Sequence, residues 1–115
     1  MQLPSTFEDL VTEANRLHLY KKLIFQLNKD FQRANIDLGF HEDVVPTSLK
    51  LILQETIYNL IQDKFSEFLN LLYIIDVPEN KVKELDGEDT LKLSEEVSFL
   101  ILKREWQKVW LRNNL

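Results

Sequence analysis

Residues that break helices are scarce in this chain, and this scarcity constrains its fold more than any other feature. Only 2 glycines and 3 prolines occur in 115 residues, whereas the two types together average roughly 12% of residues in proteins. A sandwich or barrel of short strands needs such residues at its many turns. With 44% apolar residues, the chain has enough apolar area to offset the entropy lost on folding. The sequence therefore predicts an all-α protein, and its length predicts a single helical domain over residues 1–115.

Capping and turn residues divide the chain into four predicted helices. Ser5 opens an S-x-x-E capping box with Glu8, and Gly39 can end a helix in the left-handed conformation. The predicted helices are, in order, Ser5 to Gly39, 47–73, 78–85, and Thr90 or Ser94 to Arg112. We expect these three long helices and one short helix to pack as an antiparallel helical bundle.

The second predicted helix has the widest apolar face. On a helical wheel its apolar residues cover roughly 180°, whereas an ordinary surface helix shows a stripe of about 100°. Leu60 and Phe65 lie on this face, so both are expected to be buried. The pattern predicts that this helix is the central one.

The first predicted helix carries two apolar stripes that point in different directions. Leu10 and Leu17 belong to one stripe, and Ile24 and Phe31 belong to the other, which is rotated by roughly 120°. A straight helix drifts only about 20° per heptad. Either the helix kinks near Leu17 to Tyr20 or its two halves contact different surfaces. We favour two surfaces, because no proline or glycine marks a kink there.

These unpaired stripes predict self-association. The start of the last helix is also apolar on two sides, because Val97, Leu100 and Ile101 lie opposite the face that carries Trp106. Leaving such patches wet would expose more contiguous apolar area than a soluble monomer usually tolerates. A symmetric homodimer would cover them. The residues expected at this interface are Phe7, Leu10, Val11, Leu17, Val97, Leu100 and Ile101.

The residue types that carry most enzyme chemistry are rare or absent. The chain has no cysteine, so it cannot form a thiolate metal site or a disulfide. His18 and His41 are the only histidines, and neither belongs to an E-x-x-H or H-E-x-x-H pattern. We expect His18 to be a partly buried packing residue and His41 to belong to a polar loop. The sequence therefore predicts no catalytic, metal-binding or cofactor-binding residues, and no enzyme.

Charge is distributed unevenly along the chain. The formal net charge is −5, and residues 76–96, with 3 basic and 8 acidic side chains, carry −5, while residues 97–115, with 4 basic and 1 acidic, carry +3. An acidic chain is disfavoured as a nucleic-acid binder, because affinity for phosphates requires cations. The longest apolar run, 71–75, is too short to span a membrane, which needs about 20 residues.

These observations predict a small non-enzymatic protein-protein interaction module, most simply a homodimer, in the cytoplasm of a bacterium. The alternative is a small acidic inhibitor of the immunity-protein or antitoxin kind, which would mask a basic site on an unknown protein partner through residues 76–96. A ligand-binding or enzymatic bundle that uses the surroundings of His18 is the third hypothesis. No nucleic acid and no membrane is expected among the partners.

Overall fold

The computed structural model describes residues 2–114, and every regular element in that range is an α-helix, which confirms the predicted all-α class. The helices are α1 (Phe7–Arg16), α2 (Tyr20–Arg33), α3 (Pro46–Asp63), α4 (Phe65–Ile75), α5 (Glu79–Lys83) and α6 (Thr90–Asn114). Six helices thus replace the four expected, because the first two predicted helices are each broken once. The expected bundle of three long helices and one short helix is therefore not the arrangement observed.

The first break separates α1 from α2, where the two apolar stripes change direction. His18 adopts a left-handed backbone with φ 58°. The Leu19 N–H donates to the Ala14 carbonyl over 2.8 Å and closes the end of α1. The expectation of a continuous helix with two contact surfaces was wrong. A sharp turn lets each stripe face the core in its own direction, and neither proline nor glycine was needed to make it.

The second break separates α3 from α4 at Lys64, whose backbone leaves the helical region (φ −144°, ψ 57°). Leu60, before the break, is buried as expected. Phe65, directly after it, is 55% exposed, so the expectation that it is buried was wrong. The break changes the direction of the helix axis, and a wheel drawn through residue 64 therefore assigns Phe65 to the wrong face.

Local sequence explains several other helix ends. The Thr6 hydroxyl, rather than Ser5, accepts the Asp9 N–H over 3.1 Å and caps α1. Pro46 occupies the first position of α3, where its missing N–H has no helical partner to lose. Asp76 ends α4 in the left-handed conformation with φ 71°.

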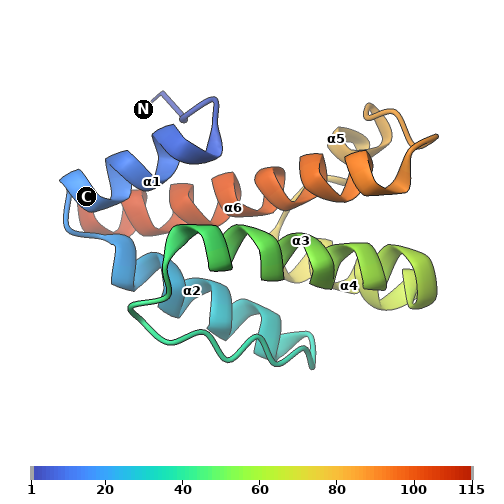
Figure 1. The fold of residues 1–115 in the computed structure, drawn as a ribbon, viewed down its shortest axis with the longest axis horizontal. Helices are drawn as coiled ribbons and strands as arrows, with labels where there is room; N and C mark the ends of the chain where they lie inside the picture. The colour runs from blue at the N-terminus through green and yellow to red at the C-terminus, as the bar shows by residue number, and fades with distance from the viewer. Residues whose placement is uncertain (1, 115) are drawn as a thin grey trace.

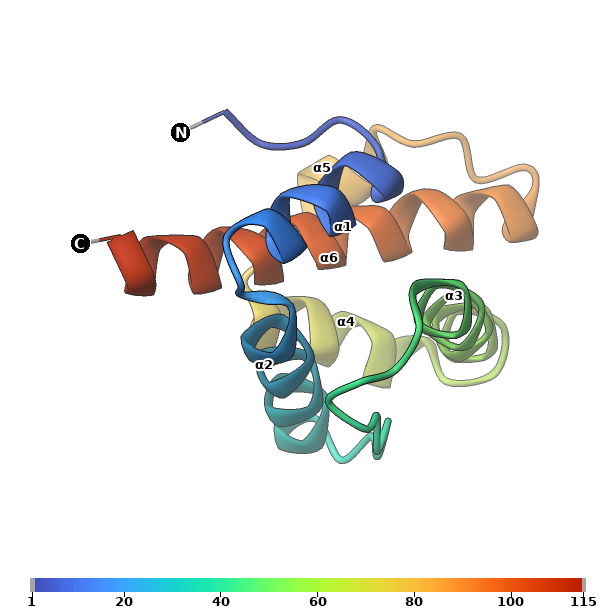
Figure 2. The ribbon, with the colours of Figure 1, turned by 60° about the vertical axis from the view of Figure 1, so that its left-hand side comes forward.

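The C-terminal helix α6, not the second predicted helix, holds the central position. It packs against α1, α2, α3 and α4. In both ribbon views α6 forms a middle layer, with α1 and α5 on one side and α2, α3 and α4 on the other (Figures 1 and 2). Because α6 is covered from both sides, its middle carries buried apolar residues on opposite faces: Val97 and Ile101 on one, and Trp106 on the other.

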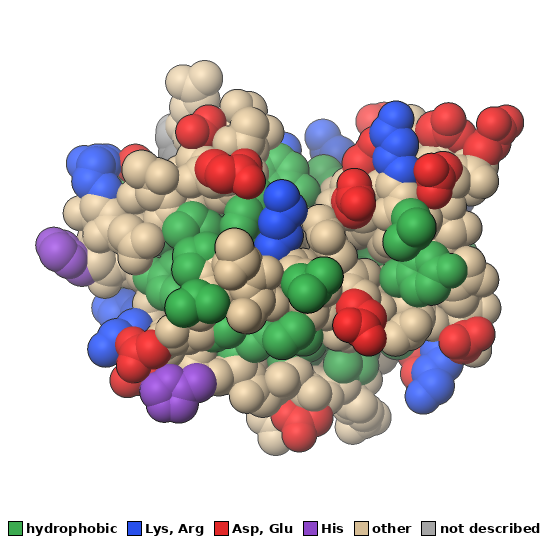
Figure 3. Space-filling model, in the orientation of Figure 1, with side chains coloured by type: hydrophobic (Ala, Val, Ile, Leu, Met, Phe, Trp, Pro, Cys, Tyr) green, Lys and Arg blue, Asp and Glu red, His purple; other side chains and the backbone are tan. Residues whose placement is uncertain are grey.

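One continuous core joins the helices. Its largest fully buried side chains are Trp106 of α6, Phe31 of α2 and Phe68 of α4. Acidic side chains gather over α5 and the first turns of α6, at the upper right of Figure 3. Among the described helices, none combines the length and apolar character that crossing a membrane requires.

Candidate functional site

The residues expected to form an interface between two chains pack inside one chain instead. Leu10, Val97 and Ile101 have no exposed surface, and Val11 is buried with them. The remaining members of the set are partly buried against the core: Phe7, Leu17 and Leu100. The structure folds α1 onto α6, so the chain covers its own apolar stripe. The expectation that a second copy covers these side chains is therefore corrected, because helices of the same chain cover them.

A cluster of polar side chains is buried where α2 meets α6. Asp30 is 1% exposed and Glu105 is fully buried. The Asp30 carboxylate accepts hydrogen bonds from the Lys108 ammonium at 2.9 Å and from the Gln26 amide at 3.0 Å. The Gln26 carbonyl in turn accepts from the Arg112 guanidinium at 3.0 Å. These contacts tie the middle of α2 to the C-terminal half of α6.

The two carboxyl groups of this cluster have opposite pKa shifts. The pKa of Glu105 is raised to about 9, first by burial and then by the neighbouring Asp30 carboxylate, while Lys108 opposes the rise. The Lys108 ammonium lies 3.2 Å from Glu105 Oε1, yet both Glu105 oxygens lack a partner with hydrogen-bond geometry among residues 2–114. For Asp30, burial would raise the pKa, but hydrogen bonds and the Lys108 charge outweigh it and lower the pKa. Glu105 is therefore neutral and Asp30 is ionised at neutral pH.

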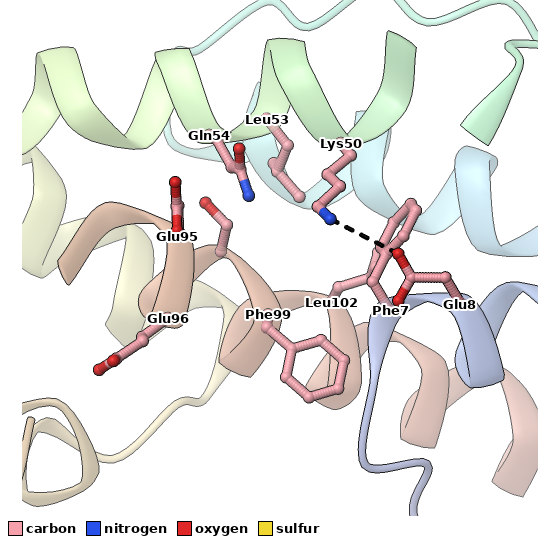
Figure 4. Close-up of a pocket in the computed structure, with 10 residues that line it drawn as sticks. Phe7, Glu8, Lys50, Leu53, Gln54, Glu95, Glu96, Phe99 and Leu102 are labelled. Atoms are coloured by element: carbon pink, nitrogen blue, oxygen red, sulfur yellow. Dashed lines mark ion pairs between the residues drawn. The ribbon is translucent and has the colours of Figure 1, made fainter. Parts of the chain in front are cut away.

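A small pocket lies between α1, α3 and α6 (Figure 4). Its volume is about 260 Å³. The Lys50 ammonium points to its α1 side, 5.4 Å from the centre of the Phe7 ring and 3.6 Å from Glu8 Oε1. Glu95 lies on the side of Gln54, whereas the neighbouring Glu96 points away from the pocket (Figure 4). The chain thus supplies its own cation to this pocket, and one of the lining carboxylates is already neutralised.

A larger and more apolar depression lies between α4, α5 and the start of α6; we call it the α4–α5–α6 groove. Its volume is about 440 Å³, within the range of about 300–1,000 Å³ that is typical of ligand pockets. The half-exposed ring of Phe65 stands at its edge, and its apolar lining includes Phe65, Phe68, Leu69, Leu72, Val82 and Leu93. Among the pockets of residues 2–114, this groove therefore has the largest apolar lining.

Acidic residues surround the groove. The segment 76–96, which forms α5, the following turn and the start of α6, has a net charge of −5. Asp86, Glu88 and Asp89 in the turn are exposed. The rest of the chain sums to zero, because residues 1–46, 47–75 and 97–115 carry −2, −1 and +3. Five of the eight acidic residues of this segment lie in α5 and the turn that borders the groove: Glu79, Glu84, Asp86, Glu88 and Asp89. Glu95 and Glu96 lie at the pocket of Figure 4 instead.

The histidines and acids form no metal centre in the part of the chain that the structure describes. Residues 2–114 contain no group of three or more His, Asp or Glu side chains placed to hold a metal ion. His18 is exposed rather than partly buried, because its left-handed backbone places it at the outside of the turn between α1 and α2. His41 lies in an exposed loop, as expected, where its Nδ1 accepts the Asp43 N–H.

Comparison with known proteins finds no counterpart for this chain: no protein-family model, curated protein or solved structure matches it.

Reasoning from the sequence missed both the buried cluster and the groove. Asp30 and Glu105 each lie among apolar helix neighbours, such as Phe31 and Trp106, and this placement was the available signal for burial. For the groove, the only signal was the combination of an apolar 65–72 stretch with the acidic 76–96 segment. Their contact depends on the break at Lys64 and on the position of α5 beside α6, which no periodicity encodes.

Proposed function

We propose that this protein is a non-enzymatic protein-interaction module that binds its partner through the α4–α5–α6 groove. The observation that carries the proposal is the exposure of large apolar side chains at this place. Phe65, which lines the groove, is 55% exposed. The groove is also lined by apolar side chains that are only partly buried: Leu69, Val82, Leu85 and Leu93. Exposed apolar surface rimmed by polar residues is typical of sites where proteins bind one another.

The placement of the titratable groups supports a binding role rather than a catalytic one. Asp30 and Glu105, the two carboxyls with opposed pKa shifts, lie inside the α2–α6 interface and line neither the groove nor the pocket of Figure 4. A catalytic acid or base must come within hydrogen-bond reach of its substrate. The buried cluster instead joins two helices, which is a structural task.

Two kinds of partner fit this proposal. One is a second copy of the chain, which would make the protein a homodimer. The other is a different protein with a basic surface, and the chain would then act as a small acidic inhibitor of the immunity-protein or antitoxin kind. The concentration of the whole net charge in residues 76–96 favours the second kind of partner.

Site-specific photo-crosslinking in cells that produce the protein tests the proposal. A benzoylphenylalanine at position 65, in the lining of the groove, should form a discrete covalent adduct, whose mass spectrum identifies either the chain itself or another protein. The matched control is the same group at Phe25, which is also largely exposed, at 66%, but lies on α2. Adducts at position 25 that equal those at position 65, or no adduct at either, would contradict the proposal.

A further inference from the structure

We infer that the partner presents a basic amphipathic helix and that this helix occupies the α4–α5–α6 groove. The inference rests on the proposed function and names the chemistry of the partner. Three observations support it: the shape of the groove, the acidic residues that border it, and the contacts that already engage the chain's own basic side chains.

The shape of the groove suits the apolar face of a helix. Its floor includes Phe68 and Leu72, which are buried in the core, and its walls come from α4, α5 and the start of α6. A surface built from helices presents a depression into which side chains at positions i, i+3 and i+4 of another helix can insert. A depression of about 440 Å³ with an apolar lining rewards large aliphatic or aromatic side chains there.

The acidic residues that border the groove favour a basic partner. Asp76 is already paired with Arg104 over 3.0 Å. The other acidic residues of the segment 76–96 have no ion-pair partner within the chain that the structure describes. One acidic and one basic side chain line the groove itself, Glu79 and Lys83. Glu88 and Asp89 stand in the exposed turn that leads into α6. Lysine and arginine on the outer face of a bound helix would complement these carboxylates.

A second copy of the chain is a poor source of that basic surface. Residues 97–115 carry +3, and three of their four cations are engaged in polar contacts inside the chain. The fourth, Lys103, lies 5.3 Å from the centre of the Phe99 ring. Arg104 pairs with Asp76, Lys108 pairs with Asp30, and Arg112 donates to Gln26. Two acidic grooves facing each other across a two-fold axis would repel. The occupant is therefore a segment of a different protein.

A synthetic peptide tests the inference without the native partner. The probe is a fluorescein-labelled helix of about 15 residues with leucines on one face and lysines on the other. One control peptide has the same composition with the leucines scattered around the helix, and a second has glutamate in place of lysine. Binding to the full chain is measured by fluorescence anisotropy at salt concentrations of about 50 mM and about 500 mM.

We expect the amphipathic basic peptide to bind about tenfold more tightly than either control, and about tenfold more weakly at high salt. Phe65→Ala should weaken its binding by about tenfold, because this ring forms the edge of the apolar surface. The matched control Phe25→Ala removes an even more exposed ring from α2 and should leave the affinity within about twofold. Circular dichroism of both variants checks that the fold is retained.

The outcomes separate this inference from the proposed function. Equal binding of all three peptides, or equal loss in Phe65→Ala and Phe25→Ala, overturns the inference, because binding would then not depend on the groove. A native partner crosslinked at position 65 that binds through an acidic or uncharged segment overturns the inference and leaves the proposed function standing. No peptide binding together with no adduct at position 65 overturns both.

Discussion

Two regions of this protein use carboxylates in opposite ways. At the α2–α6 interface, Asp30 and Glu105 are buried with Lys108 between them, and their pKa values move in opposite directions. Around the α4–α5–α6 groove, acidic residues such as Glu88 and Asp89 remain exposed. A buried carboxyl group must be paired or neutral, whereas a solvent-exposed carboxylate can stay charged without a partner. The first region can therefore hold the fold together, and the second is free to attract a partner.

The largest effect is expected when the buried cluster loses its ionised carboxylate. In Asp30→Ala, the ammonium of Lys108 would lose its 2.9 Å partner, and the Gln26 amide would lose its acceptor. Breaking a buried pair from one side typically costs about 3–5 kcal/mol. Urea denaturation measures the unfolding free energy, and Asp89→Ala in the exposed turn is the matched control, expected within about 0.5 kcal/mol of wild type. A loss below 1 kcal/mol for Asp30→Ala would mean that the cluster contributes little.

The next largest effect is expected at Glu105, where a substitution should raise the unfolding free energy rather than lower it. The folded-state pKa of Glu105 is about 9, above its ordinary value of 4.5, so the unfolded chain releases this proton first as the pH rises. The group's stabilising contribution is therefore fully present below pH 4.5 and is lost progressively as the pH rises toward 9. Glu105→Gln, which is neutral at every pH, should stabilise the protein at pH 7 by about 1–3 kcal/mol.

The pH dependence gives this prediction its own control. Urea denaturation at several pH values should show the advantage of Glu105→Gln growing as the pH rises and vanishing well below pH 4.5, where Glu105 is protonated in both states. Glu88→Gln, measured in parallel, should show no such growth, because Glu88 is exposed. If Glu105→Gln is destabilising at neutral pH, the carboxyl is ionised in the folded protein and its assignment as a neutral group fails.

The smallest effect is expected in the acidic segment beside the groove. Glu88→Gln removes one of several mutually repelling charges and should change the unfolding free energy by less than about 0.5 kcal/mol. The same variant should weaken the basic peptide measurably at low salt and hardly at all at high salt. Thermal denaturation and fluorescence anisotropy together check this. A large loss of stability would contradict the view that this region is built for binding rather than for folding.

Much of the fold followed from composition and local pattern. The shortage of glycine and proline predicted an all-α chain. The limits of α5 lie close to the predicted 78–85, and α6 begins at Thr90, one of the two predicted starts, and ends close to the predicted Arg112. The two apolar stripes of residues 7–34 correctly signalled a change of direction, although it was interpreted as two contact surfaces. The candidate site was not predictable to the same degree, because Phe65 was assigned to the core and Leu10, Val97 and Ile101 to an interface.

The physical reason lies in the range of the interactions. Helix formation depends on neighbours within about four residues, so composition and periodicity were sufficient to specify the all-α class and most helix limits. The breaks at His18 and Lys64 depend on what each helix face meets on the other side of the core. The contact that covers Leu10 with α6, and the contact that places Glu105 beside Asp30, each join residues about 75 or more positions apart. Such contacts arise only when the helices pack together, and they decide which carboxyl groups are buried and which remain exposed.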